Sequence, residues 1–245
     1  MHEKLDISYL QNTKHKMKAL IACEESQRVC VEFRKLGHEA YSCDIEPCSG
    51  EHPEWHIQND VLSLLNGNCR FKTVDGKIHK IIGHWDMIIA FPPCTHLAVS
   101  GAKHFEKKRR DGRQKEAVEF FAQILTAECK KIAVENPVGI ISGKYIKKYF
   151  PDLAEKYNLP KKPSQIIQPY MFGHRSRKNT CLWLKGLPKL KETDLVQPDL
   201  ITYKCKNGKN VTFSKDYRFK TAKDRSKTYQ GVAKAMADQW GGNVF

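Results

Sequence analysis

The run from Trp85 to Cys94 constrains the fold most, because it is an apolar stretch that ends at two prolines. Such a stretch is typical of a parallel strand that is covered on both faces. Pro92 and Pro93 cannot donate backbone hydrogen bonds to a neighbouring strand, so the strand must end there. Cys94 is then expected at the carboxyl edge of the sheet, where open α/β sheets bind ligands. A thiol in this position is a candidate nucleophile, or alternatively a small buried apolar residue.

Apolar runs and segments with helical spacing alternate along the rest of the chain. Strands are expected at residues 18–23, 39–43, 131–135 and 180–184, and helices at residues 26–36, 114–128 and 228–240. Ser26 is a suitable cap for the first helix, and Gly37 is a suitable end. Asn-Gly and Asp-Gly pairs predict a hairpin within residues 66–84. This order predicts a Rossmann-like, doubly wound α/β fold with a mostly parallel sheet.

The charge of the chain points to a polyanionic partner. Its 245 residues carry a net charge of +15, which favours nucleic acid. Residues 103–115, in a loop expected after Cys94, hold seven Lys or Arg against two Asp or Glu. Residues 185–227 hold twelve against five. Because the basic residues cluster in two segments, we expect a surface that follows phosphate groups rather than a general aid to solubility.

Cysteine usage and apolar patterning bear on the cellular location. The chain has nine cysteines, an odd number, which favours reduced thiols over a disulfide framework. The sequence has no stretch that is long and apolar enough to span a bilayer, and its first residues do not resemble a signal peptide. We therefore expect a cytoplasmic protein that has no membrane partner.

Four residues have spacings that superficially suggest a zinc site: Cys43, Cys48, His52 and His56. Cys43 falls inside a predicted strand and is expected to face the core. The prolines at positions 47 and 53 disturb any regular arrangement of ligands in this segment. Structural zinc sites depend on regular spacing and on ligands that can converge on the ion. We therefore expect no metal site.

Two acidic residues, one at the end of a predicted strand and one at the end of the next element, are candidates for binding a nucleoside. Asp44 ends the second strand, where a carboxylate can accept hydrogen bonds from ribose hydroxyls, and Asp60 can accept from an adenine amino group. The turn at residues 23–27 lacks glycine and carries Glu24 and Glu25, which argues against the phosphates of NAD, FAD or ATP. S-adenosylmethionine fits better, because it has adenosine and positive charges but no phosphate. The alternatives are a turn residue for Asp44 and a loop residue for Asp60.

Glu135 and a run of basic residues complete the candidate chemistry. Glu135 ends a strand before an Asn-Pro pair, so it is expected at the same sheet edge as Cys94. A thiolate and a carboxyl side by side can attack a ring carbon and protonate a ring nitrogen. Arg175 and Arg177, spaced by two, point the same way in an extended segment and can hold a phosphate or a base carbonyl. The alternatives are a structural cap for Glu135 and a solvated charged face for residues 173–178.

The order of these motifs resembles that of DNA cytosine-5 methyltransferases, particularly the short forms of phages and prophages. The similar pieces lie between Ala19 and about Trp240. They are Leu20-Ile21-Ala22-Cys23-Glu24-Glu25-Ser26, Ser42-Cys43-Asp44-Ile45, Asn59-Asp60-Val61, Phe91-Pro92-Pro93-Cys94, Val134-Glu135-Asn136-Pro137, His174-Arg175-Ser176-Arg177 and Thr228-Tyr229-Gln230-Gly231-Val232-Ala233. The Pro-Cys and Glu-Asn pieces followed by Arg-x-Arg are fairly specific together, and none is specific alone.

The resemblance implies a class I S-adenosylmethionine-dependent methyltransferase that acts on double-stranded DNA. Cys94 would add to C6 of a flipped-out cytosine, and Glu135 would protonate N3. Arg175 and Arg177 would steady the base carbonyl and the region of the thiolate. The cofactor would lie against Cys23, Glu24, Glu25, Ser26, Asp44, Ile45, Asp60 and Pro92. DNA would lie against Lys103, Lys107, Lys108, Arg109, Arg110 and Lys178.

The same resemblance implies an organisation and a source. Residues 1–17 would form an arm and residues 18–184 the catalytic domain. Residues 185–227 would form a small, basic DNA-recognition appendage, and residues 228–245 a helix that packs back on the catalytic domain. The protein would act in the cytoplasm of a bacterial host and would be encoded by a phage or prophage.

The chain also departs from the family pattern. Its first motif has Glu-Glu-Ser-Gln in place of glycines, Gly173 replaces a glutamine before the two arginines, and Pro93 is an extra proline. The segment between Leu190 and Arg225 is short for a target-recognition domain. Two other functions therefore stay open. One is methylation of an exocyclic amine of adenine or cytosine, whose enzymes place an aromatic residue where Cys94 stands. The other is DNA binding without catalysis.

Overall fold

A computed structural model describes residues 16–205, 208–218 and 221–242. Its centre is a seven-stranded sheet with the strand order β3-β2-β1-β6-β7-β9-β8. Five neighbouring strands are parallel: β1 (Lys18–Ala22), β2 (Glu39–Asp44), β3 (His56–Gln58), β6 (Met87–Ala90) and β7 (Ile132–Pro137). The others are β8 (Gln165–Ile167) and β9 (Thr180–Lys185), and β9 is antiparallel to β7 and β8. The predicted α/β fold with a mostly parallel sheet is confirmed, and it is compatible with a Rossmann-like fold.

The central strands form where the sequence is apolar enough to be buried from both sides. β1 and β6 lie side by side in the sheet, and Leu20, Ile21, Ile88 and Ile89 are almost fully buried. Burying a side chain of this size contributes about 1.5–3 kcal/mol. β6 ends at Ala90, before the two prolines, because proline has no backbone donor to continue the ladder.

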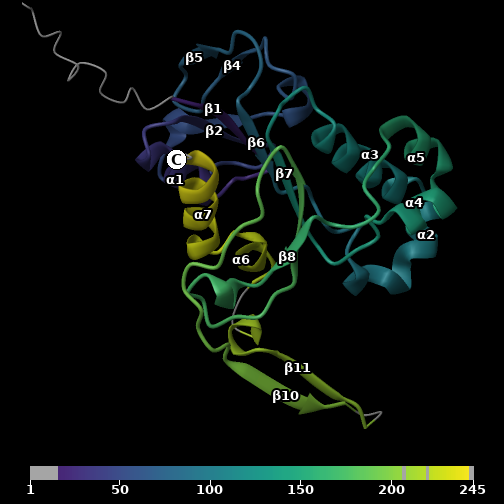
Figure 1. Ribbon diagram of the computed structural model, residues 1–245. Helices are drawn as coiled ribbons and strands as arrows, with labels where there is room; N and C mark the ends of the chain where they lie inside the picture. The colour runs from purple at the N-terminus through teal and green to yellow at the C-terminus, as the bar shows by residue number, and fades with distance from the viewer. Residues whose placement is uncertain (1–15, 206–207, 219–220, 243–245) are drawn as a thin grey trace, which may run out of the picture.

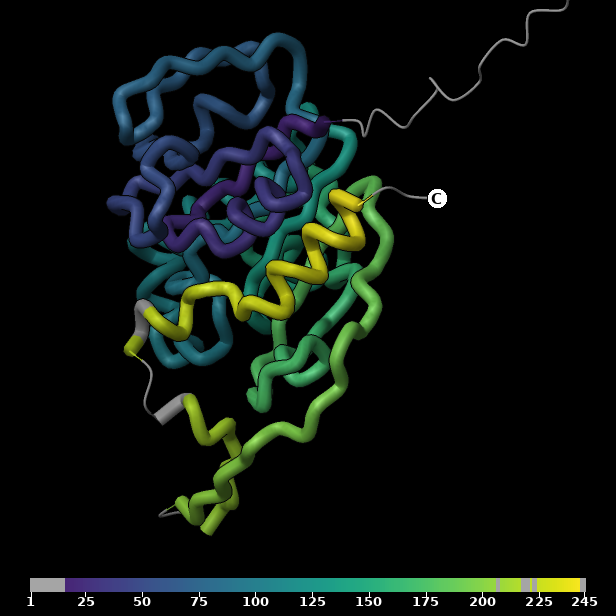
Figure 2. The backbone as a smooth tube through the Cα atoms, turned by 90° about the vertical axis from the view of Figure 1, so that its left-hand side faces the viewer, coloured from purple at the N-terminus to yellow at the C-terminus, as the bar shows by residue number. Residues whose placement is uncertain are grey.

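Helices cover both faces of the sheet (Figures 1 and 2). One face carries α1 (Arg28–Lys35) and α7 (Gln230–Met236), which pack against each other. The opposite face carries α2 (Phe105–Arg110), α3 (Arg113–Leu125), α4 (Gly143–Tyr149), α5 (Pro151–Tyr157) and the hairpin of β4 (Arg70–Lys72) and β5 (Ile78–Lys80). The hairpin predicted within residues 66–84 is therefore confirmed.

Two local predictions differ from the structure. The basic segment after Cys94 is not a loop, because a 3-10 helix (Val99–His104) leads directly into α2. The last helix is shorter than predicted: α7 ends at Met236, and a π-helical turn (Ala237–Gly241) follows it. α6 (Ala222–Ser226) precedes α7 in the chain.

A two-stranded ribbon projects from the body of the molecule (Figures 1 and 2). It consists of β10 (Leu200–Lys204) and β11 (Asn210–Ser214), which are antiparallel. The rings of Tyr203 and Phe213 stack on it with 5.2 Å between their centroids. The ribbon lies within residues 185–227, the segment expected to form a recognition appendage.

Residues 1–15, most of the predicted N-terminal arm, lie outside the described residues. Within the described ranges, no helix combines the length and the apolar composition needed to cross a bilayer. The same ranges hold no group of three or more His, Cys, Asp or Glu side chains that could bind a metal ion. Cys43 instead donates its thiol hydrogen to the carbonyl of Asn59 (3.3 Å), and His52 stacks on Trp55.

Candidate active site

A cavity of about 570 Å³ lies at the carboxyl edge of the parallel strands. Its walls come from the turns after β1, β2, β3 and β6, from α3, and from the segment between α6 and α7. It is lined by residues 23–26, 43–46, 59–61, 93–95 and 226–228, with Phe91 and Phe120. β2 follows β1 on one side of it and β6 lies on the other, so the winding of the sheet reverses here. This is the position at which open α/β sheets bind ligands.

Most residues predicted to hold a cofactor line this cavity. They are Cys23, Glu24, Glu25, Ser26, Asp44, Ile45 and Asp60. Pro92 does not line it, because Pro92 is buried and Pro93 faces the cavity instead. The carbonyl of Pro92 accepts a hydrogen bond from Nδ2 of Asn136 (2.9 Å), which fixes the Pro-Pro turn against β7.

Glu24 serves the fold as well as the cavity. Its Oε1 accepts a hydrogen bond from the backbone N–H of Val29 (2.7 Å), and its Oε2 accepts one from Cys30 (3.2 Å). Glu24 therefore caps α1, and the prediction that Ser26 does so is wrong. Burial raises the pKa of Glu24 to about 8, against the opposing effect of the two backbone donors. At neutral pH Glu24 is therefore poorly suited to attract a cation in the cavity.

The turn after β1 is built without glycine. Cys23 and Gln27 both adopt the left-handed backbone conformation, with φ values of 57° and 58°. Gln27 is fully buried, donates to the carbonyl of His52 (2.8 Å) and accepts from the backbone N–H of His52 (3.0 Å). Gly50 passes so close that an added Cβ would lie 2.4 Å from Oε1 of Gln27. One glutamine thus joins the turn after β1 to the segment between β2 and β3.

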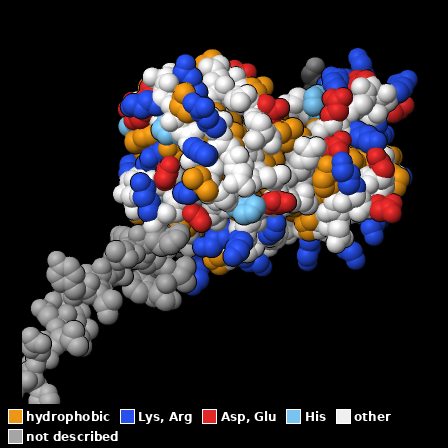
Figure 3. Space-filling view, turned by 90° about the horizontal axis from the view of Figure 1, so that it is seen from above, with side chains coloured by type: hydrophobic (Ala, Val, Ile, Leu, Met, Phe, Trp, Pro, Cys, Tyr) orange, Lys and Arg blue, Asp and Glu red, His pale blue; other side chains and the backbone are white. Residues whose placement is uncertain are grey.

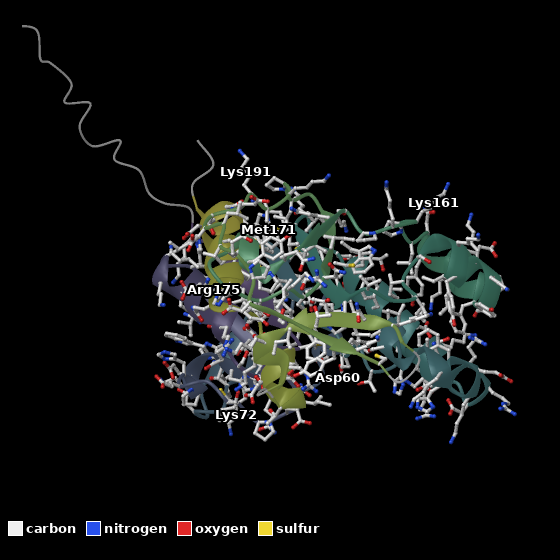
Figure 4. All side chains as sticks on the ribbon, turned by 90° about the horizontal axis from the view of Figure 1, so that it is seen from below. Asp60, Lys72, Lys161, Met171, Arg175 and Lys191 are labelled. Carbon is white, nitrogen blue, oxygen red and sulfur yellow. The ribbon has the colours of Figure 1, made fainter. Side chains whose placement is uncertain are left out.

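Carboxylates and an exposed apolar side chain line the far side of the cavity from Cys94. Oδ1 of Asp44 accepts from the backbone N–H of Glu46 (2.9 Å), and partial burial raises the pKa of Asp44. Ile45 is 70% exposed and lines the cavity. Asp60 is also exposed, and it lies apart from Arg175 when the molecule is viewed from below (Figure 4). Asp44 and Asp60 thus provide hydrogen-bond acceptors beside the apolar side chain of Ile45.

Cys94 is exposed on the same cavity. Its carbonyl accepts hydrogen bonds from the backbone N–H groups of Leu97 and Ala98 (both 2.9 Å), so the chain turns sharply after the thiol. Partial burial raises the pKa of Cys94, and Glu135 raises it further when that carboxyl is ionised. The thiol is therefore accessible but largely protonated at neutral pH.

Glu135 lies in β7, one residue beyond the pairing of Val134 with Ala90. Its Oε1 is buried and has no hydrogen-bond partner among the described residues. Burial raises the pKa of Glu135, so its neutral, proton-donating form is favoured. A small hollow of about 20 Å³ lies beside it, which has room for about one water molecule. This hollow and the large cavity share Phe91 and residues 226–228.

The two arginines expected at the thiol lie elsewhere. Nε of Arg175 lies 3.4 Å from Oδ1 of Asp199, and Arg175 lines a separate cavity of about 550 Å³. A guanidinium nitrogen of Arg177 donates to the carbonyl of Thr212 in β11 (3.3 Å). Neither residue lines the cavity of Cys94 or the hollow beside Glu135. Both are exposed and bonded toward the ribbon.

Lys178, and not an arginine, lies beside Glu135. Together with Glu135 and Thr180 it lines the small hollow, and its Nζ donates to the carbonyl of Arg225 (3.2 Å). Its positive charge lowers the pKa of both Cys94 and Glu135, against the larger effect of burial. Lys178 therefore faces Glu135, whereas the sequence predicts it on a DNA-contacting surface.

The other residues expected to contact DNA fall into two groups. Three of them are exposed: Lys103, Lys107 and Arg110. Lys108 is buried, and its Nζ donates to the carbonyl of Thr95 (2.6 Å). Arg109 donates to the hydroxyl of Tyr145 (2.7 Å) and lies over the ring of Tyr149. Lys108 and Arg109 hold the segment after Cys94 in place. They are therefore bonded within the protein, whereas the sequence predicts that they contact DNA.

The basic residues do not gather on every side of the molecule. In the view from above, Lys and Arg side chains are interspersed with acidic ones (Figure 3). On the opposite side, the ribbon carries Lys204, Lys209 and Lys215 in or beside its strands, and all three are exposed. This distribution agrees with the clustering noted in residues 185–227.

Two features of the site were not predicted from the sequence. Asn136 ties the Pro-Pro turn to β7, and residues 226–228 form a wall shared by the cavity and the hollow. The role of Asn136 could have been predicted from its position directly after Glu135. The wall at residues 226–228 is harder to predict, because these residues lie far along the chain from Cys94.

Comparison with known proteins adds no family to this description. No model of a known protein family matches the chain, and no curated protein does.

Proposed function

We propose that this protein is an S-adenosylmethionine-dependent DNA methyltransferase that acts on C5 of cytosine. One observation carries the proposal: Cys94 is exposed on a cavity at the switch point of the sheet, and this cavity shares Phe91 and residues 226–228 with the hollow beside Glu135. Glu135 is a half-buried acid whose Oε1 is buried and has no partner among the described residues. A nucleophile beside a neutral acid is the pair that addition to a pyrimidine ring requires.

The cavity has the size and the chemistry for the proposed cofactor. Ligand cavities usually measure about 300–1,000 Å³, and this one is within that range. Asp44 can accept from ribose hydroxyls, the exposed side chain of Ile45 can pack against an adenine ring, and Glu25 can attract the ammonium group. The turn after β1 has carboxylates and no phosphate-binding glycines, which suits a cofactor without phosphate. When bound, S-adenosylmethionine supplies an electrophilic methyl group on its sulfonium.

In the proposed mechanism Cys94 and Glu135 act on opposite parts of the ring. Cys94 loses its proton to water, and the thiolate sulfur forms a bond to C6. Glu135 donates its proton to N3, so the electron pair displaced from the ring leaves C5 nucleophilic. After methylation at C5, loss of the C5 proton to a base expels Cys94 as thiolate. The N3 proton returns to Glu135, which restores both the ring and the acid.

The ribbon and the exposed lysines after Cys94 are the proposed contacts to the DNA duplex. A two-stranded ribbon is narrow enough to enter the major groove. The hydroxyls of Thr202 and Thr212 share a hydrogen bond across the ribbon (2.8 Å), and Lys204 lies on the same side by strand alternation. Extruding a base costs a few kcal/mol, and such contacts would offset this cost.

A covalent trap tests the proposal. The full chain is incubated with duplex DNA that contains 5-fluorocytosine and with S-adenosylmethionine, and the mixture is run on a denaturing gel. We expect a protein–DNA adduct in the wild type and in Cys205→Ser, because Cys205 is an exposed thiol on the ribbon segment, outside the cavity. We expect none in Cys94→Ser.

The other outcomes identify the alternatives. Methyl transfer to DNA without an adduct would favour exocyclic-amine methylation. DNA retention with neither adduct nor methyl transfer would favour a binding protein without catalysis. An adduct that persists in Cys94→Ser would refute the assigned nucleophile.

A further inference from the structure

Strand register puts Lys178 on the same side of the sheet as Glu135. In the antiparallel pair of β7 and β9, Leu182 is opposite Glu135, and Thr180 is opposite Pro137. Opposite residues of such a pair project from the same face, and the projection alternates along each strand. Lys178 precedes Thr180 by two positions and continues this alternation. Its place in the hollow with Glu135 and Thr180 agrees with the register.

The same alternation turns the neighbouring arginine away. Arg177 precedes Lys178 by one position, so its side chain is expected on the other side of the extended segment. Its hydrogen bond to the carbonyl of Thr212, in the ribbon, agrees with this orientation. Within residues 175–178, Lys178 is therefore the one basic side chain that lies beside Glu135.

We propose that Lys178, rather than Arg175 or Arg177, supplies the positive charge that faces Glu135 in the hollow and eases the loss of the proton from Cys94, whose cavity shares residues 226–228 with that hollow. The ammonium group is anchored by its hydrogen bond to the carbonyl of Arg225 (3.2 Å). A cation near a thiol stabilises the thiolate, which is the nucleophilic form. The proposal deepens the proposed function, on which it rests for the identity of the substrate.

Other charged groups share the two cavities and must be separated from Lys178. The acidic ones are Glu24, Glu25, Asp44, Glu46 and Asp60, on the large cavity, and Glu135, on the hollow. Carboxylates near Cys94 oppose its ionisation. Lys227 lines both cavities, whereas Lys178 lines only the hollow. Lys227 is therefore the matched control, because it tests whether any nearby lysine has the same effect.

The rate at which iodoacetamide alkylates Cys94 tests the proposal without DNA or cofactor. The rate is measured against pH on the folded full chain, and mass spectrometry of the peptide that contains Cys94 distinguishes it from the other cysteines. In Lys178→Gln, which keeps a donor for the carbonyl of Arg225 but loses the charge, we expect about fivefold slower alkylation near neutral pH and a higher midpoint. Lys178→Arg should restore the wild-type midpoint.

The control variants decide between a specific charge and a general structural effect. Lys227→Gln, Arg175→Gln and Arg177→Gln should leave the midpoint of Cys94 close to that of the wild type. An unchanged midpoint in folded Lys178→Gln would overturn the proposal. An equal shift in Lys227→Gln or Arg177→Gln would overturn it too. Because alkylation needs no substrate, the shift can be present even if the 5-fluorocytosine trap gives no adduct, so the two proposals fail separately.

Discussion

Nδ2 of Asn136 donates a hydrogen bond to the carbonyl of Pro92 across 2.9 Å. This bond joins the turn that carries Cys94 to the strand that carries Glu135. Both partners are buried, and Asn136 is only 1% exposed. The two candidate reactive groups are thus held together by a side chain that reacts with nothing itself.

Replacing this amide should loosen the turn. Asn136→Ala leaves the buried carbonyl of Pro92 without a donor, and we expect a loss of about 1–3 kcal/mol in the free energy of unfolding. Urea denaturation measures the loss. Asn210→Ala, at an exposed position in β11, is the control and should change stability by less than about 0.5 kcal/mol. Equal stability of the two variants would contradict the role of Asn136.

Stability should depend on pH through Glu24. The pKa of Glu24 rises from the ordinary 4.5 in the unfolded chain to about 8 in the folded one. Between these values the unfolded state has lost the proton that the folded state keeps, so the free energy of unfolding falls as the pH rises. The slope from this one group is at most about 1.4 kcal/mol per pH unit.

Glu24→Gln removes the titrating group and should flatten this slope between about pH 5 and pH 8. Urea denaturation at several pH values measures it. Glu46→Gln, an exposed position on the same cavity, should keep the wild-type slope. If the free energy of unfolding of the wild type does not fall between about pH 5 and pH 8, the carboxyl of Glu24 is ionised in the folded protein.

Binding of the cofactor should depend on Asp44 and not on Glu135. Asp44→Ala removes the acceptor proposed for the ribose, and we expect S-adenosylmethionine to bind at least about tenfold more weakly, as a hydrogen bond to a charged group predicts. Isothermal titration calorimetry without DNA measures this. Glu135→Gln is the control, because Glu135 does not line the large cavity. If both variants bind like the wild type, the cofactor lies elsewhere.

The salt dependence of DNA binding should become weaker when exposed lysines of the ribbon are removed. We expect Lys204→Gln with Lys215→Gln to reduce the slope of log affinity against log salt by about 0.9 for each phosphate that is no longer neutralised. Fluorescence anisotropy with a labelled duplex measures the slope. Lys185→Gln, at the opposite end of β9 from Lys178, should leave it unchanged. A slope that is equal in all three proteins would place the ribbon away from DNA.

The ends of the strands could be predicted from the sequence, and with them the main candidate residues. Two prolines follow the strand before Cys94, and proline ends a ladder for a reason that does not depend on the rest of the fold. The strand of Glu135 ends two residues later than predicted, because Asn136 and Pro137 still pair with β9. Parallel neighbours then bring their ends to one edge. This is why Cys94, Asp44 and Asp60 lie on one cavity, as predicted.

The orientation of single side chains could not be predicted in the same way. A shift of one residue reverses the face of an extended segment, and residues 173–178 have no apolar alternation that fixes the register. Arg177 therefore lies toward the ribbon and Lys178 lies beside Glu135, the reverse of the predicted placement. Lys108 is a similar case, because a lysine can bury its alkyl stem while its ammonium finds a carbonyl, and composition alone does not reveal this.

The capping of α1 differs from the prediction for another reason. Short polar residues such as Ser26 are preferred caps, and the sequence offers one. In the structure the left-handed conformation of Gln27 delays the helix until Arg28, and the longer side chain of Glu24 reaches the first free N–H groups. Backbone conformation outside regular elements decides the outcome.

The hollow beside Glu135 has room for about one water molecule, and a pyrimidine ring is much larger. A ring that enters must displace residues 226–228 or the side chain of Lys178, and that displacement costs free energy. A long polymer can offset the cost through its many distant contacts, whereas a free nucleobase brings none. Selectivity for polymer over monomer would thus arise because the site opens only for a substrate that is already bound firmly elsewhere on the protein.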